Sequence, residues 1–163
     1  MNMIVAVDKN WGIGCQNKLL ISIPEDMRFF REKTMNKTVI LGKRTLDTFP
    51  GGKPLKNRNN IVITRDENCK IEDAIVVHSI EESLKEANRF QSEETYVIGG
   101  ASIYRQMLPL CDTAFVTKIE EAYQADTFFP NLDEDDSWEI TKVSETNNSC
   151  GVEYAFYKYE RRK

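Results

Sequence analysis

Short runs of apolar, mostly β-branched residues constrain the fold of this chain more than any other feature. Each run ends at turn residues, and five occur in the first hundred positions: MIVAVD (3–8), TVILG (38–42), NIVIT (60–64), AIVVH (74–78) and TYVIGG (95–100). A strand with one solvated face alternates apolar and polar residues, whereas continuous apolar runs indicate strands that are buried on both faces. The sequence therefore predicts a sheet that other elements cover on both sides.

Helical patterns separate these runs, at PEDMRFFREKT (24–34), IEESLKEANRF (80–90) and ASIYRQML (101–108). Ile80, Leu84 and Ala87 fall on one helical face, as expected of a helix that packs on a sheet. Strands that alternate with helices favour parallel pairing, because each helical crossover returns the chain to the same end of the sheet.

The last third of the chain changes its pattern. AFVTKI (114–119) predicts another strand, and WEITKVSE (138–145) and VEYAFYKYERR (152–162) alternate like the arms of a hairpin around TNNSCG. The expected fold class is α/β: a three-layer sandwich with a central, mostly parallel sheet of about eight strands, an antiparallel C-terminal edge hairpin and helices on both faces. Because no repeat or linker interrupts the sequence, residues 1–163 are expected to form a single domain.

Composition argues against several classes of protein. The net charge of −4 does not suit a broad basic surface for nucleic acid. No apolar run approaches the roughly 20 residues that a membrane span needs, and the N-terminus lacks the pattern of a signal peptide. Because no long exposed apolar pattern calls for a partner, a monomer is expected.

The cysteines are far apart and form no C-x-x-C pair; they are Cys15, Cys69, Cys111 and Cys150. His78 is the sole histidine, so a zinc site would have few ligands and no metal is expected. Reduced thiols in a cytoplasmic protein are the expected state, with Cys111 as a small core residue. A nucleophilic pair of a cysteine with His78 is an alternative.

The ends of the predicted strands are the places where a sheet of this kind binds ligands. Gly99 and Gly100 follow one strand directly, and glycines let a ligand approach the backbone closely. The next helix offers N–H groups to an anion, and Ser102 adds a hydroxyl. A tight turn without a ligand is the alternative, since the fingerprint G-x-G-x-x-G is absent.

Two further strand ends carry positive charge. Gly42 is followed by KRT (43–45), and another strand ends at Thr64 and Arg65. Cations at a helix N-terminus oppose the helix dipole, and a bound phosphate would reverse that effect. Together the three ends favour a phosphate-rich ligand, with enough charge for an additional phosphate on a ribose. Side chains that simply turn into solvent would also explain each end by itself.

The first helical pattern is preceded by a serine and carries two adjacent carboxylates. Ser22 and Glu25 fit the S-x-x-E capping box, which explains Glu25 structurally. Asp26 lies on the same helical face as Phe29 and Phe30. A first-turn Asp is favourable to the helix dipole, but beside buried aromatics it is costly without a cationic or N–H-donating partner. A planar ligand with an amidine-like edge would supply two such donors.

With these residues in place, the chain resembles a bacterial dihydrofolate reductase. The resemblance covers essentially the whole chain and rests on IVAVDKNWGIGCQNKL, IPEDMRFFREKT, VILGKRT, PLKNRNNIVIT, YVIGGASIY, DTFFP and YER, in this order. It implies the reduction of 7,8-dihydrofolate to 5,6,7,8-tetrahydrofolate by hydride transfer from NADPH, for one-carbon and thymidylate metabolism.

The resemblance also implies which residues form the site. Asp26 matches the catalytic acid that pairs with the pterin, and Arg58 matches the arginine that holds the folate α-carboxylate. The substrate-binding residues so implied are Ile4, Val5, Ala6, Asp26, Met27, Phe30, Phe49, Lys53, Arg58 and Thr117. The cofactor-binding residues so implied are Ala6, Ile13, Gly14, Leu19, Gly42, Lys43, Arg44, Thr45, Thr64, Arg65, Ile98, Gly99, Gly100, Ala101, Ser102, Ile103 and Tyr104. A cis peptide between Gly99 and Gly100 is implied as well, with His78 peripheral.

The sequence departs from the family pattern in two places. LLI (19–21) stands where the family reads LPW, so Ile21 replaces a tryptophan whose indole N–H helps to hold a water near the pterin. The sequence does not show whether Trp11 substitutes for it. Leu46 stands where an aromatic is common. Two rivals follow: another pterin or pyrimidine reductase of the same fold, and a non-catalytic folate or nucleotide binder.

Overall fold

The computed structural model describes residues 1–16 and 18–163. The helices are α1 (Pro24–Thr34), α2 (Lys43–Asp47), α3 (Ile80–Ala87) and α4 (Ala101–Met107). The strands are β1 (Asn2–Val7), β2 (Gly12–Cys15), β3 (Lys18–Leu19), β4 (Thr38–Gly42), β5 (Asn59–Ile63), β6 (Ile75–Val77), β7 (Thr95–Gly99), β8 (Thr113–Ile119), β9 (Thr127–Phe128), β10 (Trp138–Val143), β11 (Asn147–Ser149) and β12 (Val152–Arg161). Short 3-10 helices are η1 (Pro50–Gly52), η2 (Ser92–Glu94), η3 (Leu108–Leu110) and η4 (Leu132–Glu134).

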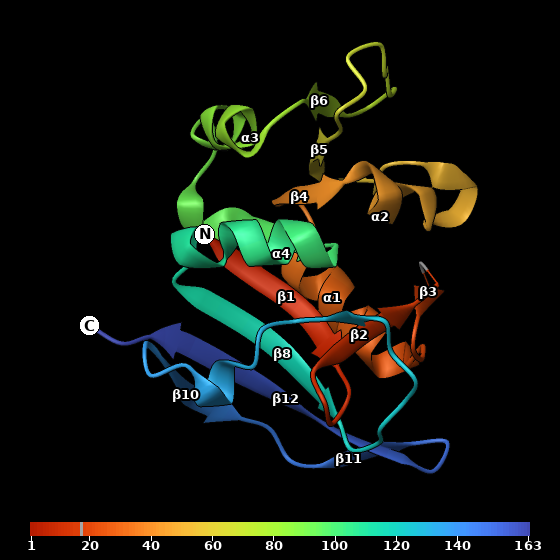
Figure 1. Cartoon of the computed structure of the whole chain (residues 1–163), viewed down its shortest axis with the longest axis vertical. Coiled ribbons are helices and arrows are strands. Elements are labelled where there is room, and N and C mark those ends of the chain that lie inside the picture. Colours follow the sequence, from red (N-terminus) through yellow and green to blue (C-terminus); the bar gives the residue numbers. More distant parts are fainter. Residues whose placement is uncertain (17) are drawn as a thin grey trace.

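A twisted central sheet runs through the molecule (Figure 1). In the described part of the chain it has nine strands in the order β10-β12-β8-β1-β7-β4-β5-β6, with β11 beside β12. The strands from β8 to β6 pair in parallel, and β12 and β10 add antiparallel strands at one edge. The α/β class, the mostly parallel sheet and the C-terminal hairpin are therefore confirmed.

A second, smaller sheet was not expected from the sequence. Its order is β3-β2-β9 among the described residues, and both pairings are antiparallel. Two of its strands contain only two residues each, Lys18–Leu19 and Thr127–Phe128. Strands this short carry no periodicity to recognise, because period-two alternation needs at least four positions.

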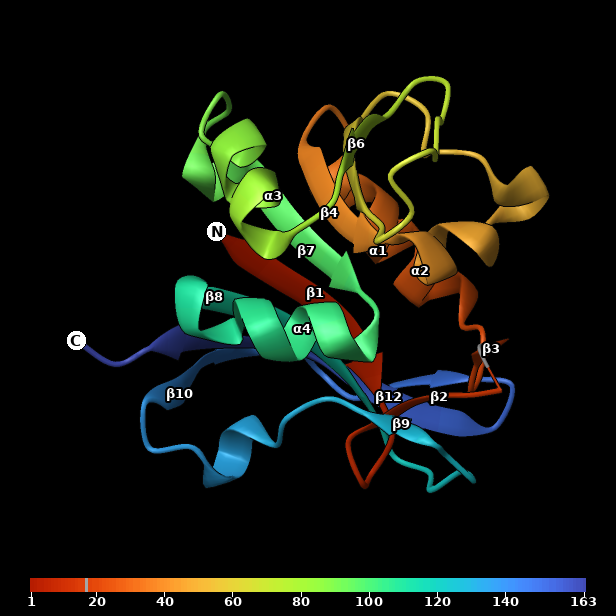
Figure 2. The ribbon, with the colours of Figure 1, turned by 45° about the horizontal axis from the view of Figure 1, so that its top comes forward.

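The core consists of one layer of side chains on each face of the sheet, and helices α3 and α4 lie over the same face (Figure 2). The layer under α3 and α4 contains Met3, Val5, Val7, Ile40, Ile61, Val97, Ala87, Tyr104 and Met107. The layer under α1 and α2 contains Ile4, Val39, Leu41, Val62, Tyr96, Phe29, Phe30 and Leu46. Because neighbouring residues of each strand point to opposite faces, apolar residues are needed at every position, which is the pattern that the sequence shows.

The ladder between β1 and β7 ends early, and this break positions the site. The two strands pair only at Asn2 with Tyr96 and at Met3 with Val97. On its other side, β1 continues to pair with β8 as far as Val7. The carbonyl of Ile4 is therefore released from the ladder toward β7, and the Tyr104 hydroxyl donates to it over 2.7 Å. Such a point, where neighbouring strands diverge, is where open α/β sheets bind ligands.

Two local predictions about the segment before α1 have clear outcomes. The capping box is wrong: the N-cap is Ile23, and no side chain caps the helix, because α1 begins at Pro24 and leaves Ser22 outside its first turn. Trp11 does not replace the missing indole. It is 7% exposed and stacks on Phe129, at 6.2 Å between ring centroids, in the layer under α4.

Within the described residues, no helix is long and apolar enough to cross a membrane.

Candidate active site

Asp26 lies in the first turn of α1 and points its carboxylate at the central sheet. The Thr117 hydroxyl, on β8, donates to Asp26 Oδ1 over 2.6 Å. Burial raises the pKa of Asp26 above its ordinary value, and the Thr117 hydrogen bond offsets part of that rise. Thr117 itself is 2% exposed. The structure therefore contains a carboxyl group that holds its proton more tightly than a surface Asp and has a fixed orientation.

The expected pterin wall of β1 lies next to this carboxylate. Ile4 and Val5 are buried, and Ala6 is half-buried against Ile23 and Tyr154. Tyr104 reaches the Ile4 carbonyl from α4, and burial, followed by the negative charge of Asp26, raises the pKa of the Tyr104 phenol. The Tyr104 proton is thus held by the backbone.

In the turn from β7 into α4, the backbone packs closely against Thr45 and Tyr104. The peptide between Gly99 and Gly100 is cis, as implied by the resemblance. A Cβ atom on Gly100 would lie 3.2 Å from Thr45 Oγ1, and one on Gly99 would lie 3.3 Å from the Tyr104 ring. Gly99 also has a φ of +122°, a conformation that suits glycine. The two glycines form a cradle of bare backbone at the carboxyl end of β7.

Three predicted strand ends meet at one edge of the sheet. Gly42 pairs with Ile63 of β5, and Leu41 pairs with Gly99 of β7, so the ends of β4, β5 and β7 are adjacent. The residues that they carry include Thr45, Thr64 and the basic side chains Lys43, Arg44 and Arg65. A Cβ on Gly42 would lie 3.3 Å from Ile103 of α4, which shows how closely the backbone approaches there.

The basic side chains at this edge differ in their partners. Lys43 forms an ion pair with Asp47 one turn later in α2, and this hydrogen bond raises the pKa of the Lys43 ammonium. Within residues 1–16 and 18–163, neither Arg44 nor Arg65 has a carboxylate within ion-pair distance. Exposed and unpaired guanidinium groups are suited to receive a phosphate.

A second basic region lies at the far end of α1. Arg58 Nε donates to Thr34 Oγ1 over 3.3 Å, and its Nη1 donates to the Lys56 carbonyl over 2.9 Å. Burial, followed by the positive charge of Arg31, lowers the pKa of Arg58. The Arg58 side chain lines a hollow of about 310 Å³ with Asn36, Asn57 and Asn59. Two guanidinium groups that repel each other beside an open hollow favour an anionic ligand.

The remaining residues that were predicted to bind substrate differ in their exposure to solvent. Phe30 and Phe49 are half-buried and pack in the layer under α1 and α2. Met27 is 51% exposed, and Lys53 is exposed on the segment after η1. The structure thus brings Asp26, the β1 wall and the aromatic pair together, whereas Lys53 stands apart on the surface.

The loop after β1 approaches the site through the small sheet. Ile13 and Gly14 lie on β2, and Leu19 lies on β3 with 69% of its surface exposed. The side chain of Asp8, which sequence reasoning missed, anchors the start of this loop. Asp8 is 3% exposed, and its carboxylate accepts from the N–H groups of Asn10, Gly12 and Tyr123 at 2.8–2.9 Å. An Asp directly after a strand and four residues before a glycine is a sequence sign of such an Asx-type turn.

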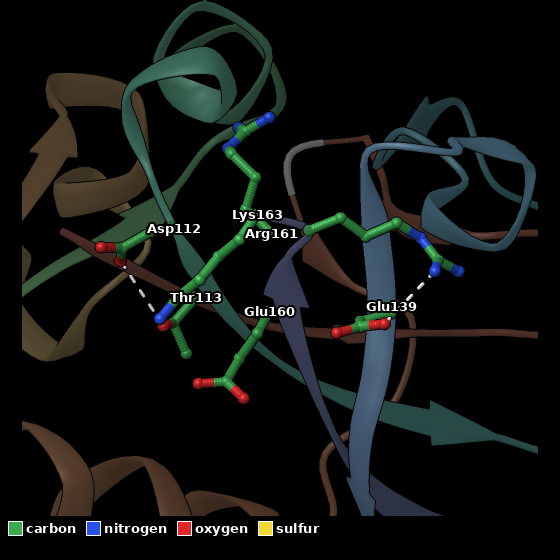
Figure 3. Close-up of a pocket in the computed structure, with 7 residues that line it drawn as sticks. Asp112, Thr113, Glu139, Glu160, Arg161 and Lys163 are labelled. Atoms are coloured by element: carbon green, nitrogen blue, oxygen red, sulfur yellow. Dashed lines mark hydrogen bonds and ion pairs between the residues drawn. The ribbon is translucent and has the colours of Figure 1, made fainter.

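Another hollow lies elsewhere, at the C-terminal end of β12 (Figure 3). Its volume is about 560 Å³, and its lining residues are Asp112, Thr113, Glu139, Glu160, Arg161, Arg162 and Lys163. The Arg161 guanidinium donates hydrogen bonds to the carbonyls of Cys111 and Leu108 and lies over the Trp138 ring. Arg162 pairs with Glu139. None of the predicted site residues lines this hollow.

The remaining candidate reactive or metal-binding groups are the cysteines and His78. All four cysteines lie in the described residues and are free, and Cys111 is 1% exposed, which confirms it as a core residue. His78 Nδ1 lies 3.0 Å from the Thr64 carbonyl. The described part of the chain contains no group of three or more His, Cys, Asp or Glu side chains that could hold a metal ion.

Comparison with known proteins identifies one family. The family model described as dihydrofolate reductase matches residues 1–161. The dihydrofolate reductase of Staphylococcus haemolyticus is 34% identical over 163 residues, with 99% of this chain and 95% of the relative covered. That of Neisseria gonorrhoeae is 36% identical over 159 residues, with 98% and 96% covered.

Solved structures lead to the same family. The structure of dihydrofolate reductase from Enterococcus faecalis complexed with NADP(H) and RAB-propyl superimposes with a TM-score of 0.88. It is 33% identical in sequence, and the match covers 99% of this chain and 96% of that one. A family model over nearly the whole chain, full-length relatives and a matching fold leave one conclusion: the chain belongs to the dihydrofolate reductase family.

Proposed function

We propose that the side chains around Asp26 and the ends of β1, β4, β5 and β7 carry out the reaction of this family. The protein is an NADPH-dependent oxidoreductase that reduces 7,8-dihydrofolate to 5,6,7,8-tetrahydrofolate. The observation that supports our assignment of the catalytic residue is the half-buried Asp26 carboxylate, oriented by Thr117 beside the free end of the β1–β7 ladder.

In this proposal, Asp26 binds the amino group and the adjacent ring nitrogen of the pterin through its two carboxylate oxygens. Both are N–H donors, and a carboxylate that accepts two parallel hydrogen bonds is the stronger arrangement. The negative charge of Asp26 polarises the ring and raises the basicity of the imine nitrogen that receives a proton. Thr117 keeps the carboxylate oriented. Burial strengthens these electrostatic effects, because fewer water dipoles oppose them.

The residues at the sheet edge fit a dinucleotide that bears an additional phosphate. Gly99 and Gly100 place backbone without side chains at this edge, packed closely against Tyr104 and Thr45. Among the described residues, Arg44 and Arg65 have no competing carboxylate. When it is bound, NADPH supplies the hydride. The protein must hold the two rings face to face, and we assign this positioning to the walls formed by β1 and by the β7–α4 turn.

The folate tail is assigned to the hollow beside α1. Arg58 has a planar, always charged guanidinium group, which suits the α-carboxylate of the glutamate. Its two present partners, Thr34 and the Lys56 carbonyl, use its Nε and one Nη atom, so the other Nη atom has no partner in the described structure. This assignment distinguishes the proposal from a pterin reductase whose substrate lacks a glutamate tail.

The experiment that tests the proposal is NADPH oxidation with dihydrofolate, followed by absorbance. We expect the wild-type chain to consume NADPH and Asp26→Asn to lose turnover by at least about 100-fold near neutral pH, since general acid–base and charge assistance contribute roughly 10²–10⁴-fold. Folded wild-type protein without NADPH consumption would favour the non-catalytic binder. Unchanged turnover in Asp26→Asn would remove Asp26 from the mechanism.

Four further features belong to the same proposal. We propose that residues 1–163 act as one domain and that the protein is a cytoplasmic monomer that uses no metal. The free cysteines support a reducing compartment. Size-exclusion chromatography with light scattering would test the monomer directly.

A further inference from the structure

We propose that Tyr154 is a positioning residue for Asp26, whose hydroxyl donates to the Asp26 carboxylate through one bridging water. The inference rests on the function proposed above for Asp26, but it concerns a residue of β12 that lies outside all the predicted site positions. Tyr154 lies on the same face of the sheet as Thr117.

Strand register places the two side chains together. Tyr154 pairs with Ile119, and Phe156 pairs with Thr117, across the antiparallel ladder of β12 and β8. Alternate residues of a strand share a face, so Tyr154 is the diagonal neighbour of Thr117, at about 7–8 Å between backbones. Thr117 in turn donates to Asp26. A tyrosine side chain is long enough to bridge this separation with the help of one water molecule.

Packing holds the Tyr154 ring directly under the start of α1. Tyr154 is 2% exposed and forms a cluster with Ile23 and Ile119, against which Ile21 packs. The Phe156 ring lies 5.6 Å from the Tyr154 ring, edge to face. The Phe156 ring also stacks on Phe29 of α1 at 4.5 Å. The ring of Tyr154 is therefore fixed, and its position relative to the first turn of α1 is determined by contacts on several sides.

The hydroxyl of this buried ring has no partner of its own. No hydrogen bond within the described residues uses the Tyr154 hydroxyl, in contrast to Tyr104, which donates to Ile4, and Tyr159, which donates to Asp133. At the same time, no buried side-chain oxygen or nitrogen in that part of the chain is left unsatisfied. The Tyr154 hydroxyl must therefore reach solvent, where a water molecule can satisfy it.

Two carboxylates face this hydroxyl. Burial, and then the charges of Glu25 and Asp26, raise the pKa of Tyr154. Glu25 is exposed and can turn into water, whereas Asp26 is held by Thr117. The described groups that interact with Asp26 by a hydrogen bond or through charge are Thr117 on β8, Tyr104 on α4 and Tyr154 on β12. Of these, only Thr117 and Tyr154 can donate a proton to the carboxylate, because the Tyr104 proton is used by Ile4.

The positioning role of Tyr154 also bears on Ile21, which stands where the family has a tryptophan. Ile21 packs against the cluster that contains Tyr154 and offers no hydrogen bond. The hydroxyl of Tyr154 is then the polar group that this side of the site contributes toward Asp26. A donor to the ionised carboxylate favours the charged form, so Tyr154 and Thr117 act in the same direction, against the effect of burial.

The test measures the Asp26 titration in the full chain without substrate, by ¹³C NMR of the carboxyl carbon. Tyr154→Phe removes only the hydroxyl, and we expect the Asp26 midpoint to rise by roughly half a unit to one unit, because a water-mediated donor to the anion is lost. The matched control is Tyr157→Phe on the opposite face of β12, which should leave the midpoint unchanged. In the pH profile of kcat/KM, the limb assigned to Asp26 should move upward by the same amount.

Several results would overturn the inference. An unchanged Asp26 midpoint in folded Tyr154→Phe, or an equal shift in Tyr157→Phe, contradicts it. If Tyr154→Phe does not fold, the reciprocal measurement decides: coupling must act in both directions, so Asp26→Asn should lower the Tyr154 phenol midpoint, and an unchanged midpoint refutes the coupling. Because these titrations need no turnover, they separate this inference from a failure of the proposed function.

Discussion

Replacing Thr117 with valine removes one hydrogen bond and leaves the shape of the side chain almost unchanged. In the described structure, the Thr117 hydroxyl is the one protein group that donates to the Asp26 carboxylate, over 2.6 Å. Thr117 is 2% exposed, so water cannot easily take its place. The loss should therefore depend on the charge of Asp26, because the strength of the bond depends on whether its acceptor is ionised.

The sign of the pH dependence follows from the pKa of Asp26. Burial raises this pKa in the folded protein. The stability contributed by Asp26 is therefore fully present below the unfolded-state pKa and is lost as the pH rises through the folded-state pKa. Above that pKa, Thr117→Val removes a bond to an ion, worth about 1.5–3 kcal/mol, whereas below it the bond is worth about 0.5–1.5 kcal/mol. The difference, about 1 kcal/mol, corresponds to a further rise of the Asp26 pKa by nearly one unit.

Urea unfolding of wild type and Thr117→Val at one pH below and one pH above the Asp26 titration midpoint, which NMR locates, measures this difference. Thr117→Ser keeps the hydroxyl and loses a methyl group, so it should show a loss that does not depend on pH. Equal losses for Thr117→Val at both pH values would refute the reasoning, since they would mean that the mutation reports packing alone. A loss for the serine variant as pH-dependent as that for valine would refute it as well.

Four other variants test the site. Asp26→Asn should increase the free energy of unfolding near pH 8 while it abolishes turnover, since a buried charge is removed; equal or lower stability in urea would contradict this. Arg58→Ala should raise the KM for dihydrofolate by roughly 10–100-fold with little change for NADPH, as expected for a lost charge-assisted pair; an unmoved KM would favour a substrate without a glutamate tail. Arg44→Ala combined with Arg65→Ala should weaken NADPH binding by at least about 10-fold but leave NADH binding nearly unchanged; fluorescence titration with both cofactors checks this. Ile21→Trp should change the Kd of dihydrofolate or of an antifolate, measured by calorimetry, whereas identical values would show that the loop has compensated.

The elements with long apolar or amphipathic patterns could be predicted from the sequence. The runs that end near Gly42, Ile63 and Gly99 form strands of the central sheet. Ile80, Leu84 and Ala87 share the core layer of α3, as their spacing indicates. The start of α1 could not be predicted correctly, because the S-x-x-E motif and Pro24 compete for the first turn and the backbone begins the helix at the proline.

In the candidate site, too, features of the local sequence could be predicted and contacts between distant segments could not. Glycines and cations at strand ends are visible in the sequence, since they break an otherwise apolar pattern. Local patterns do not show which residues meet Asp26: Thr117, implied only by the family resemblance, and Tyr154, which was not predicted, are far away along the chain on strands whose patterns look ordinary. Asp8 was missed for a related reason, since a buried carboxylate that is satisfied by backbone N–H groups leaves only a weak turn pattern in the sequence.

By itself, the sequence determined the layers. Apolar residues at every position of short strands require cover on both faces, and intervening amphipathic helices supply it. Only the tertiary structure decided where the β1–β7 ladder stops, which donors reach Asp26, and that Trp11 packs away from Ile21. The physical reason is that burial and periodicity are local properties of the chain, whereas the pKa of a carboxylate depends on groups brought together from distant segments.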